Sequence, residues 1–188
     1  MAEAVRGNDA PVRPARRRVF FALWPDEATR TAITRASRDA VRHCGGKPTP
    51  STNLHITLAF LGPITAADLA KVEALTPPPT VPFEIVLDRL KLWERAQLLW
   101  VGPSFIPEPL LTLERELWDQ LVDLGFKRER RPYVPHVTLA RKAQAARGTI
   151  TPVPWRLDGM ALVESKTGPR SSRYTVLKSW PFVSLGSE

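Results

Sequence analysis

Residues 54–60 read Leu-His-Ile-Thr-Leu-Ala-Phe, and residues 135–141 read Pro-His-Val-Thr-Leu-Ala-Arg. Both stretches contain the pattern His-x-Thr-Leu-Ala, which begins at His55 in the first and at His136 in the second, in a chain with three histidines. β-Branched residues and the alternation of large apolar with smaller or polar side chains favour an extended strand in both places. The sequence therefore predicts two matching strands, one in each half of the chain.

Each predicted strand presents a histidine and a threonine on the same face. Successive side chains of a strand point to opposite sides, so His55 lies with Thr57, and His136 with Thr138, each pair roughly 6–7 Å apart. The aliphatic side chains between them point the other way and predict a buried packing surface. Two such strands predict a polar cleft with approximate twofold symmetry.

The two histidines point to acid–base chemistry. Histidine can accept a proton in one step and donate one in another near neutral pH, because its ordinary pKa is about 6.5. The residues alone do not assign which histidine is the base and which is the acid. The hydroxyls of Thr57 and Thr138 are suited to hold an oxyanion between them, and phosphate is the natural fit.

The doubled motif and its flanks, residues 53–62 and 131–141, resemble the two-histidine (2H) phosphoesterases. Within that superfamily they are similar to the RNA 2′,3′-cyclic phosphodiesterases, also called 2′-5′ RNA ligases. The resemblance extends to residues 18–23 near the start, and to residues 162–165 and Tyr174 near the end, so that it covers about residues 18–182.

The resemblance implies hydrolysis of RNA 2′,3′-cyclic phosphate ends to 2′-phosphomonoesters, without a metal or other cofactor. It assigns His136 as the proton acceptor that activates water and His55 as the proton donor to the leaving 3′-oxygen. Thr57 and Thr138 would hold the nonbridging oxygens. Reversal of the same path implies ATP-independent 2′-5′ ligation.

Three residues around the second motif match family positions that contact phosphate or RNA. They are Arg141, Arg131 and Tyr133, whose ring is suited to stack on a base. In an uninterrupted strand Arg141 would face away from His136 and Thr138. Its role therefore requires a β-bulge or the end of the strand at this point.

Mixed strands and helices without regular βαβ alternation predict an α+β fold, with two pseudosymmetric lobes of antiparallel sheet plus helices around a central cleft. Further strands are predicted at residues 18–23, 83–92 and 98–101, and helices at residues 27–42, 66–74 and 109–124. The proline-rich residues 76–82 predict a linker between the halves, and residues 153–165 with 173–182 predict a hairpin whose tip is residues 166–172. We expect a single bilobal domain over residues 18–182, a disordered basic tail over residues 1–17 and a short tail over residues 183–188.

The charge of the chain favours an anionic partner. A net charge of +8 and a pI near 10.2 suit RNA or nucleotides that carry a 2′,3′-cyclic phosphate. No apolar stretch approaches the roughly 18 residues of a membrane span, so no membrane partner is expected. Because Cys44 is the single cysteine, no intrachain disulfide can form, and we expect a monomer in the cytoplasm.

Three other interpretations compete with this one. A metal-dependent hydrolase would show tighter His, Asp and Glu clusters than two separate His-x-Thr units. A noncatalytic RNA-binding module would use the basic surface but would not need both histidines. A sister 2H activity on another cyclic or 2′-5′-linked nucleotide is the nearest rival, and substrate competition would separate it from the main interpretation.

Overall fold

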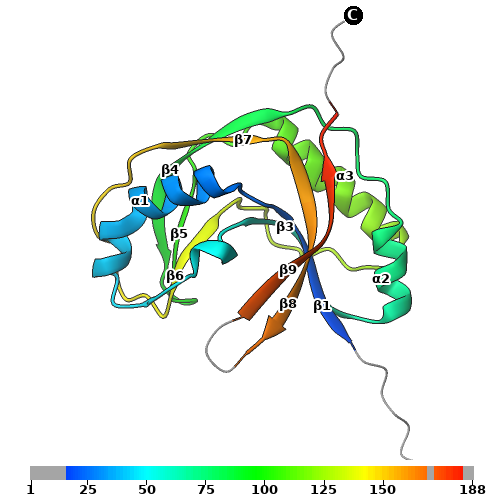
Figure 1. Cartoon of the computed structure of the whole chain (residues 1–188), viewed down its shortest axis with the longest axis horizontal. Helices are drawn as coiled ribbons and strands as arrows, with labels where there is room; N and C mark the ends of the chain where they lie inside the picture. Colours follow the sequence, from blue (N-terminus) through cyan, green and yellow to red (C-terminus); the bar gives the residue numbers. More distant parts are fainter. Residues whose placement is uncertain (1–15, 169–171, 184–188) are drawn as a thin grey trace, which may run out of the picture.

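The computed structural model describes residues 16–168 and 172–183. The strands of this part of the chain form one antiparallel sheet in the order β7-β4-β5-β6-β3-β1-β8-β9, with the short β2 paired to β6 (Figure 1). Their bounds are β1 (Arg17–Leu23), β2 (Lys47–Pro48), β3 (Ile56–Ile64), β4 (Phe83–Trp93), β5 (Leu98–Pro103), β6 (Val137–Arg141), β7 (Val153–Leu157), β8 (Gly159–Thr167) and β9 (Ser172–Pro181). With its three helices the chain has the predicted α+β fold.

The sheet has two halves that meet where β3 lies beside β6. One half contains β7, β4, β5 and β6, and the other contains β3, β1, β8 and β9. The pairing between the halves is short, because Ile56 opposite Val137 is the pair that joins β3 to β6. Each half therefore contributes one strand of the repeated motif at the junction.

The helices form where the sequence predicts them. Helix α1 (Glu27–His43) begins after Asp26, whose carboxylate accepts a hydrogen bond from the Thr29 amide at 2.7 Å. Helix α2 (Ala66–Glu73) begins after Thr65. In helix α3 (Glu108–Asp123) a stripe of leucines at helical spacing is buried, namely Leu110, Leu113, Leu117 and Leu121. Local periodicity and capping residues thus determine all three helices.

The helices pack across the two halves rather than each on its own half. Helix α1 follows β1 in the chain but contacts β6 and β7 of the other half, whereas α3 follows β5 and contacts β3. In Figure 1, α1 lies over the side of the sheet that contains β4, β5 and β6, and α3 lies on the side of β8 and β9. Because each half is covered by a helix from the other half of the sequence, the halves interlock.

The last strands correct the predicted hairpin. Residues 153–165 do not form one strand, because β7 ends at Leu157 on β4 while β8 begins at Gly159 on β1. The chain thus passes from one half to the other at Asp158, whose carbonyl accepts a hydrogen bond from the Phe182 amide at 2.7 Å. Strands β8 and β9 do form a hairpin, and residues 169–171 of its predicted tip lie outside the described residues.

Several predicted boundaries also shift. Both motif strands are predicted to include their histidine, but β3 begins at Ile56 and runs on to Ile64, and β6 begins at Val137, so each histidine directly precedes its strand. Strand β1 includes Arg17, which was predicted to belong to the tail and whose Nε donates to Glu164 at 2.6 Å. The rest of the predicted N-terminal tail, and residues 184–188 of the C-terminal one, lie outside the described residues. Residues 76–82 form neither helix nor strand, as predicted.

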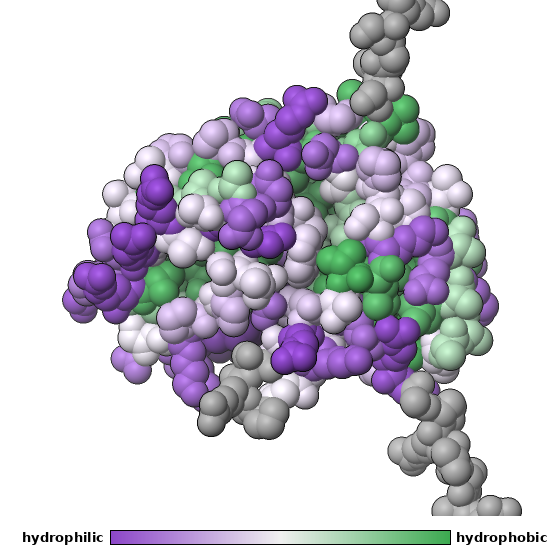
Figure 2. Space-filling view, in the orientation of Figure 1, coloured by the Kyte–Doolittle hydropathy of each residue, from purple (hydrophilic) through white to green (hydrophobic). Residues whose placement is uncertain are grey.

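The face of the molecule in Figure 2 is mixed. It carries hydrophilic residues, many residues of intermediate hydropathy and several groups of hydrophobic residues. Within residues 16–168 and 172–183, no helix is both long and apolar enough to cross a membrane.

Candidate active site

The two His-x-Thr motifs lie side by side. The antiparallel register set by Ile56 and Val137 places His55 across from Thr138, and Thr57 across from His136. Residues directly opposite each other in an antiparallel pair point to the same face. Ile56 and Val137 are fully buried on the other face, while the two histidines and two threonines are half-buried. The four polar side chains therefore share one face at the junction of the two halves.

Both imidazoles are held by the same local hydrogen bond. The Nδ1 atom of His55 lies 2.7 Å from the carbonyl oxygen of Asn53, and Nδ1 of His136 lies 2.8 Å from that of Val134. A carbonyl oxygen can only accept a hydrogen bond, so Nδ1 carries the proton in each neutral ring. The Nε2 atom of each ring is therefore the one available for proton transfer, and in His55 it lies 3.2 Å from Thr57 Oγ1.

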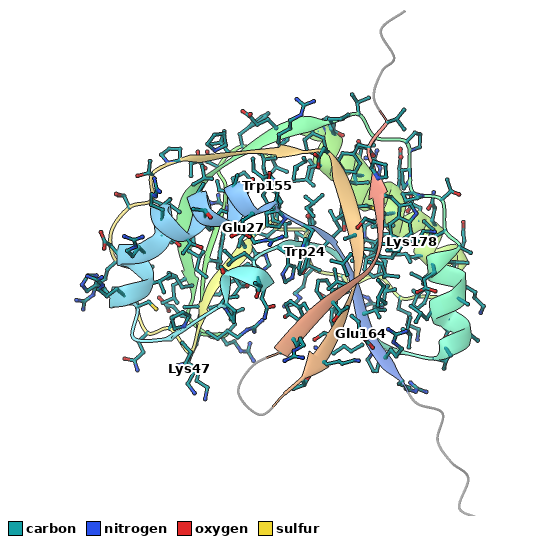
Figure 3. All side chains as sticks on the ribbon, viewed as in Figure 1. Trp24, Glu27, Lys47, Trp155, Glu164 and Lys178 are labelled. Atoms are coloured by element: carbon teal, nitrogen blue, oxygen red, sulfur yellow. The ribbon has the colours of Figure 1, made fainter. Side chains whose placement is uncertain are left out.

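Three aromatic rings surround His55, from β1, from the residue that follows it and from β9. Trp24 stacks on the imidazole with ring centroids 5.6 Å apart, Phe20 lies at 4.8 Å, and Tyr174 of β9 meets it edge-on at 5.3 Å. Figure 3 shows Trp24 between the two halves of the molecule. The pKa of His55 is lowered to about 4. Burial is the largest cause, the bond to Asn53 opposes it, and the charges of His136 and Arg141 add to the lowering.

The surroundings of His136 are also aromatic but come from the other half of the sheet. Trp93, at the end of β4, meets the imidazole at 4.5 Å, and Trp100 of β5 lies at 5.9 Å. Burial lowers the pKa of His136, the bond to Val134 opposes this change, and the charge of Arg141 adds to it. At neutral pH both free imidazoles are therefore in the form that can accept a proton.

A bulge in β6 decides where Arg141 points. Leu99 of β5 pairs with Ala140, but the next residue of β5, Trp100, pairs with Thr138, so Leu139 is an extra residue in β6. One extra residue reverses the alternation of side chains beyond it and returns Arg141 to the face of Thr138. The charge of Arg141 accordingly lowers the pKa of both histidines.

A cavity of about 1080 Å³ opens beside His136. It extends from Thr57 and His136 to helix α3 and to residues 128–134. Tyr133 and Arg131 both line it: Tyr133 has a buried hydroxyl that lacks a hydrogen-bond partner among the described residues, and the exposed Arg131 donates to Glu129 at 2.9 Å. The structure thus places these two predicted residues on the His136 side of the site.

Several residues of the site escape prediction, most of them because they are remote from the motifs in the sequence; Asn53 belongs to the flank of the first motif but was given no role. They include Phe20, Trp24, Trp93 and Trp100 around the two rings, Glu114 in the cavity, and Asn53, whose side-chain amide also donates to the Ser172 carbonyl at 2.8 Å. Tryptophans beside strands are usually core residues, so their identity carries no signal. Tyr174 was noted as part of the family resemblance, without a role.

No group of three or more His, Cys, Asp or Glu residues in residues 16–168 and 172–183 is arranged to hold a metal ion.

Comparisons with known proteins identify the family of this chain. The family model described as the 2′-5′ RNA ligase superfamily matches residues 24–169. The RNA 2′,3′-cyclic phosphodiesterase of Escherichia coli is 32% identical over 87% of this chain and 95% of its own length. That of Thermus thermophilus is also 32% identical, over 87% of this chain and 89% of its own length.

The crystal structure of E. coli LigT complexed with 3′-AMP superimposes with a TM-score of 0.79 at 30% identity, covering 89% of this chain and 98% of that one. The chain therefore belongs to the 2′-5′ RNA ligase superfamily.

Proposed function

We propose that this protein hydrolyses RNA 2′,3′-cyclic phosphate ends to 2′-phosphomonoesters, with His55 and His136 as a metal-independent acid–base pair. The observation that carries the proposal is the pair of imidazoles at one strand junction, each with Nδ1 bound to a carbonyl and Nε2 available. The names of the relatives from E. coli and T. thermophilus support the substrate.

In the proposed reaction His136 Nε2 takes a proton from water as the water oxygen bonds to phosphorus. The bond from phosphorus to the 3′-oxygen breaks, and His55 Nε2 gives its proton to that oxygen. The product carries a 2′-phosphate and a free 3′-hydroxyl. After the reaction His136 releases its extra proton to solvent. His55 takes up a new proton from solvent when the next substrate binds.

His55 can act as the proton donor only if substrate binding raises its low pKa. In the free protein His55 is neutral near pH 7, because its pKa is about 4. A bound phosphate is an anion close to the ring, and a nearby negative charge raises the pKa of an imidazole. When the substrate binds, His55 therefore takes up from solvent the proton that it later donates.

The hydroxyls of Thr57 and Thr138 donate hydrogen bonds to the nonbridging phosphate oxygens, and Arg141 adds a positive charge on the same face. Such donors stabilise the charge that builds up on these oxygens in the transition state. In the free protein the Thr57 hydroxyl is already within 3.2 Å of His55 Nε2. Arg131 and Tyr133 contact the RNA beyond the phosphate.

Reversal of the path joins a cyclic phosphate to a 5′-hydroxyl as a 2′-5′ bond, because a 5′-oxygen takes the place of water. The energy of the cyclic phosphate drives this ligation, so no ATP is required. The protein acts as a monomer in the cytoplasm, which the single, buried and unpaired Cys44 suits.

The test incubates the purified protein, in EDTA, with a short RNA that ends in a 2′,3′-cyclic phosphate. The wild type is expected to convert the end to a 2′-phosphate, identified by its mobility and its sensitivity to phosphatase. His55→Ala and His136→Ala are expected to lose this activity. His43→Ala is the matched control, because this third histidine lies exposed at the end of α1.

The proposal would be wrong if the wild type did not convert the RNA end, or if the wild type and the three variants converted it equally. Activity that EDTA abolishes would move the reaction to a metal-dependent mechanism. Faster turnover of another cyclic or 2′-5′-linked nucleotide in direct competition would favour the sister 2H activity.

A further inference from the structure

The cavity beside His136 is large enough for a nucleoside. Its volume is about 1080 Å³, slightly above the usual range of about 300–1,000 Å³ for small-molecule sites. Among the described residues, its lining includes Thr57 and His136 but not His55. The cavity therefore lies on one side of the phosphate position, the side served by His136.

The charge of the cavity does not suit a phosphate. Its lining holds three carboxylates, Glu94, Glu114 and Glu129, and three guanidinium groups, Arg95, Arg128 and Arg131. Two of the arginines are already paired, Arg128 with Glu114 at 2.6 Å and Arg131 with Glu129 at 2.9 Å. In a chain with a net charge of +8, such a balanced lining favours an uncharged group.

The walls of the cavity suit a flat ring. Phe60, Trp93, Trp118 and Tyr133 contribute aromatic surface to the lining. Aromatic side chains bind unpaired bases by stacking, which is the common way in which single-stranded RNA is recognised. Trp93 also contacts His136, with ring centroids 4.5 Å apart, so a base beside Trp93 would lie next to the reacting groups.

Two polar side chains of the cavity lining, Glu114 and Tyr133, have hydrogen-bonding capacity that the described residues do not use. Glu114 is 5% exposed; Arg128 binds its Oε2, and its Oε1 has no hydrogen-bond partner among the described residues. The Tyr133 hydroxyl is buried and similarly unpaired, and the charge of Glu114 helps to raise its pKa. Burying an unpaired polar group is unfavourable, so a ligand that bonds the Tyr133 hydroxyl removes this cost, and the same ligand can donate to the Glu114 carboxylate.

A carboxylate only accepts hydrogen bonds, so its complement is a base edge that carries N–H donors. Guanine presents two adjacent donors, N1–H and the N2 amino group, which match the Oε1 atom of Glu114 and the remaining lone pair of the Oε2 atom that Arg128 binds. Adenine has an acceptor at N1 and therefore lacks this pair. Glu114 thus favours guanine over the other bases.

We propose that this cavity is a guanine-selective site for the nucleoside on the attacking side of the phosphate. The inference rests on the proposed function, in which His136 serves the attacking oxygen. When a guanosine 5′-hydroxyl replaces water, its oxygen bonds to phosphorus and its proton passes to His136. The bond from phosphorus to the 3′-oxygen breaks, and that oxygen takes the proton of His55.

The first test measures binding of guanosine, inosine, adenosine and cytidine to the whole protein by isothermal titration calorimetry. Guanosine is expected to bind about tenfold more tightly than adenosine, with inosine in between because it lacks the N2 amino group. Glu114→Gln should abolish the preference, since its amide replaces one acceptor with a donor. Asp123→Asn should keep it, because it removes an exposed carboxylate from the end of the same helix.

Equal affinities of the wild type for all four nucleosides would overturn the guanine site. So would a preference that persists in Glu114→Gln when circular dichroism shows that the variant is folded. The affinities of the wild type for the four nucleosides need no variant. They test the guanine preference even if Glu114→Gln does not fold.

A second test identifies the side of the phosphate, with two RNAs that end in guanosine or adenosine 2′,3′-cyclic phosphate. The ratio of their kcat/KM values is expected to be the same in the wild type and in Glu114→Gln. A ratio that changes would place the terminal base in the cavity and overturn the assignment to the attacking side. Failure of the proposed function is distinct, because neither RNA would then be hydrolysed, while the nucleoside affinities would still judge the guanine site.

Discussion

The two histidines have the same local structure but different neighbours. Both directly precede a strand, and both bind the carbonyl oxygen two residues earlier through Nδ1. His55 lies among Phe20, Trp24 and Tyr174, which come from β1, the residue after it and β9. His136 instead contacts two tryptophans and opens onto the large cavity. A repeated motif thus supplies two equivalent nitrogens, and the surroundings make them unequal.

The largest expected effect comes from removing either histidine. His55→Ala and His136→Ala should each lower kcat by about 10²–10⁴, the usual contribution of a general acid or base. Because the two groups act in one step, the double variant should lose hardly more than either single variant. Single-turnover assays at saturating cyclic-phosphate RNA measure this. Losses that multiply in the double variant would show that the histidines act independently.

The burial of His55 should also make the stability of the fold depend on pH. The pKa of His55 in the folded protein is about 4, below the ordinary 6.5, so the unfolded chain takes up a proton first as the pH falls. The contribution is complete above pH 6.5 and is lost as the pH falls to 4, in total about 3 kcal/mol.

Urea unfolding at several values between pH 7 and pH 4 measures this loss. His55→Gln should flatten the dependence over this window, whereas His43→Gln, at an exposed histidine, should leave it as in the wild type. Identical curves for the two variants would contradict the burial of His55.

Arg141→Gln tests the effect of the Arg141 charge on the pKa of both histidines. Removing the guanidinium should raise the pKa of both imidazoles, since its positive charge disfavours their protonated forms. It should also lower kcat/KM about 10- to 100-fold, the worth of a hydrogen bond to a charged group. Lys142→Gln, at the next residue, is the control. A pH–rate profile whose acidic limb stays in place would argue against the position of Arg141.

The smallest expected effect distinguishes the two aromatic environments. Trp24→Ala admits water to His55 and should raise its pKa by about 1, because burial is the largest cause of its low value. Trp93→Ala should raise the pKa of His136 instead. Histidine chemical shifts followed by NMR against pH report each ring separately. If both rings responded equally to either substitution, the two environments would not be separate.

Local sequence determines the parts of this protein that depend on neighbouring residues. The alternation of side chains at residues 54–60 predicts which face carries His55 and Thr57, and Asp26 and Thr65 mark the starts of two helices. These features follow from the geometry of strands and of helix ends, which involves only a few consecutive residues. The family resemblance adds the reaction that such a pair of motifs performs.

The tertiary structure decided what depends on residues far apart in the chain. It placed Trp24 and Tyr174 around His55, brought Glu114 of α3 beside Tyr133, and returned Arg141 to the face of the histidines through the bulge at Leu139. It also passed the chain between the halves at Asp158, where the sequence predicts an unbroken strand. The sequence could not foresee these features, because burial, pairing register and cavity shape are set by the packing of all the elements together rather than by the residues of any one of them.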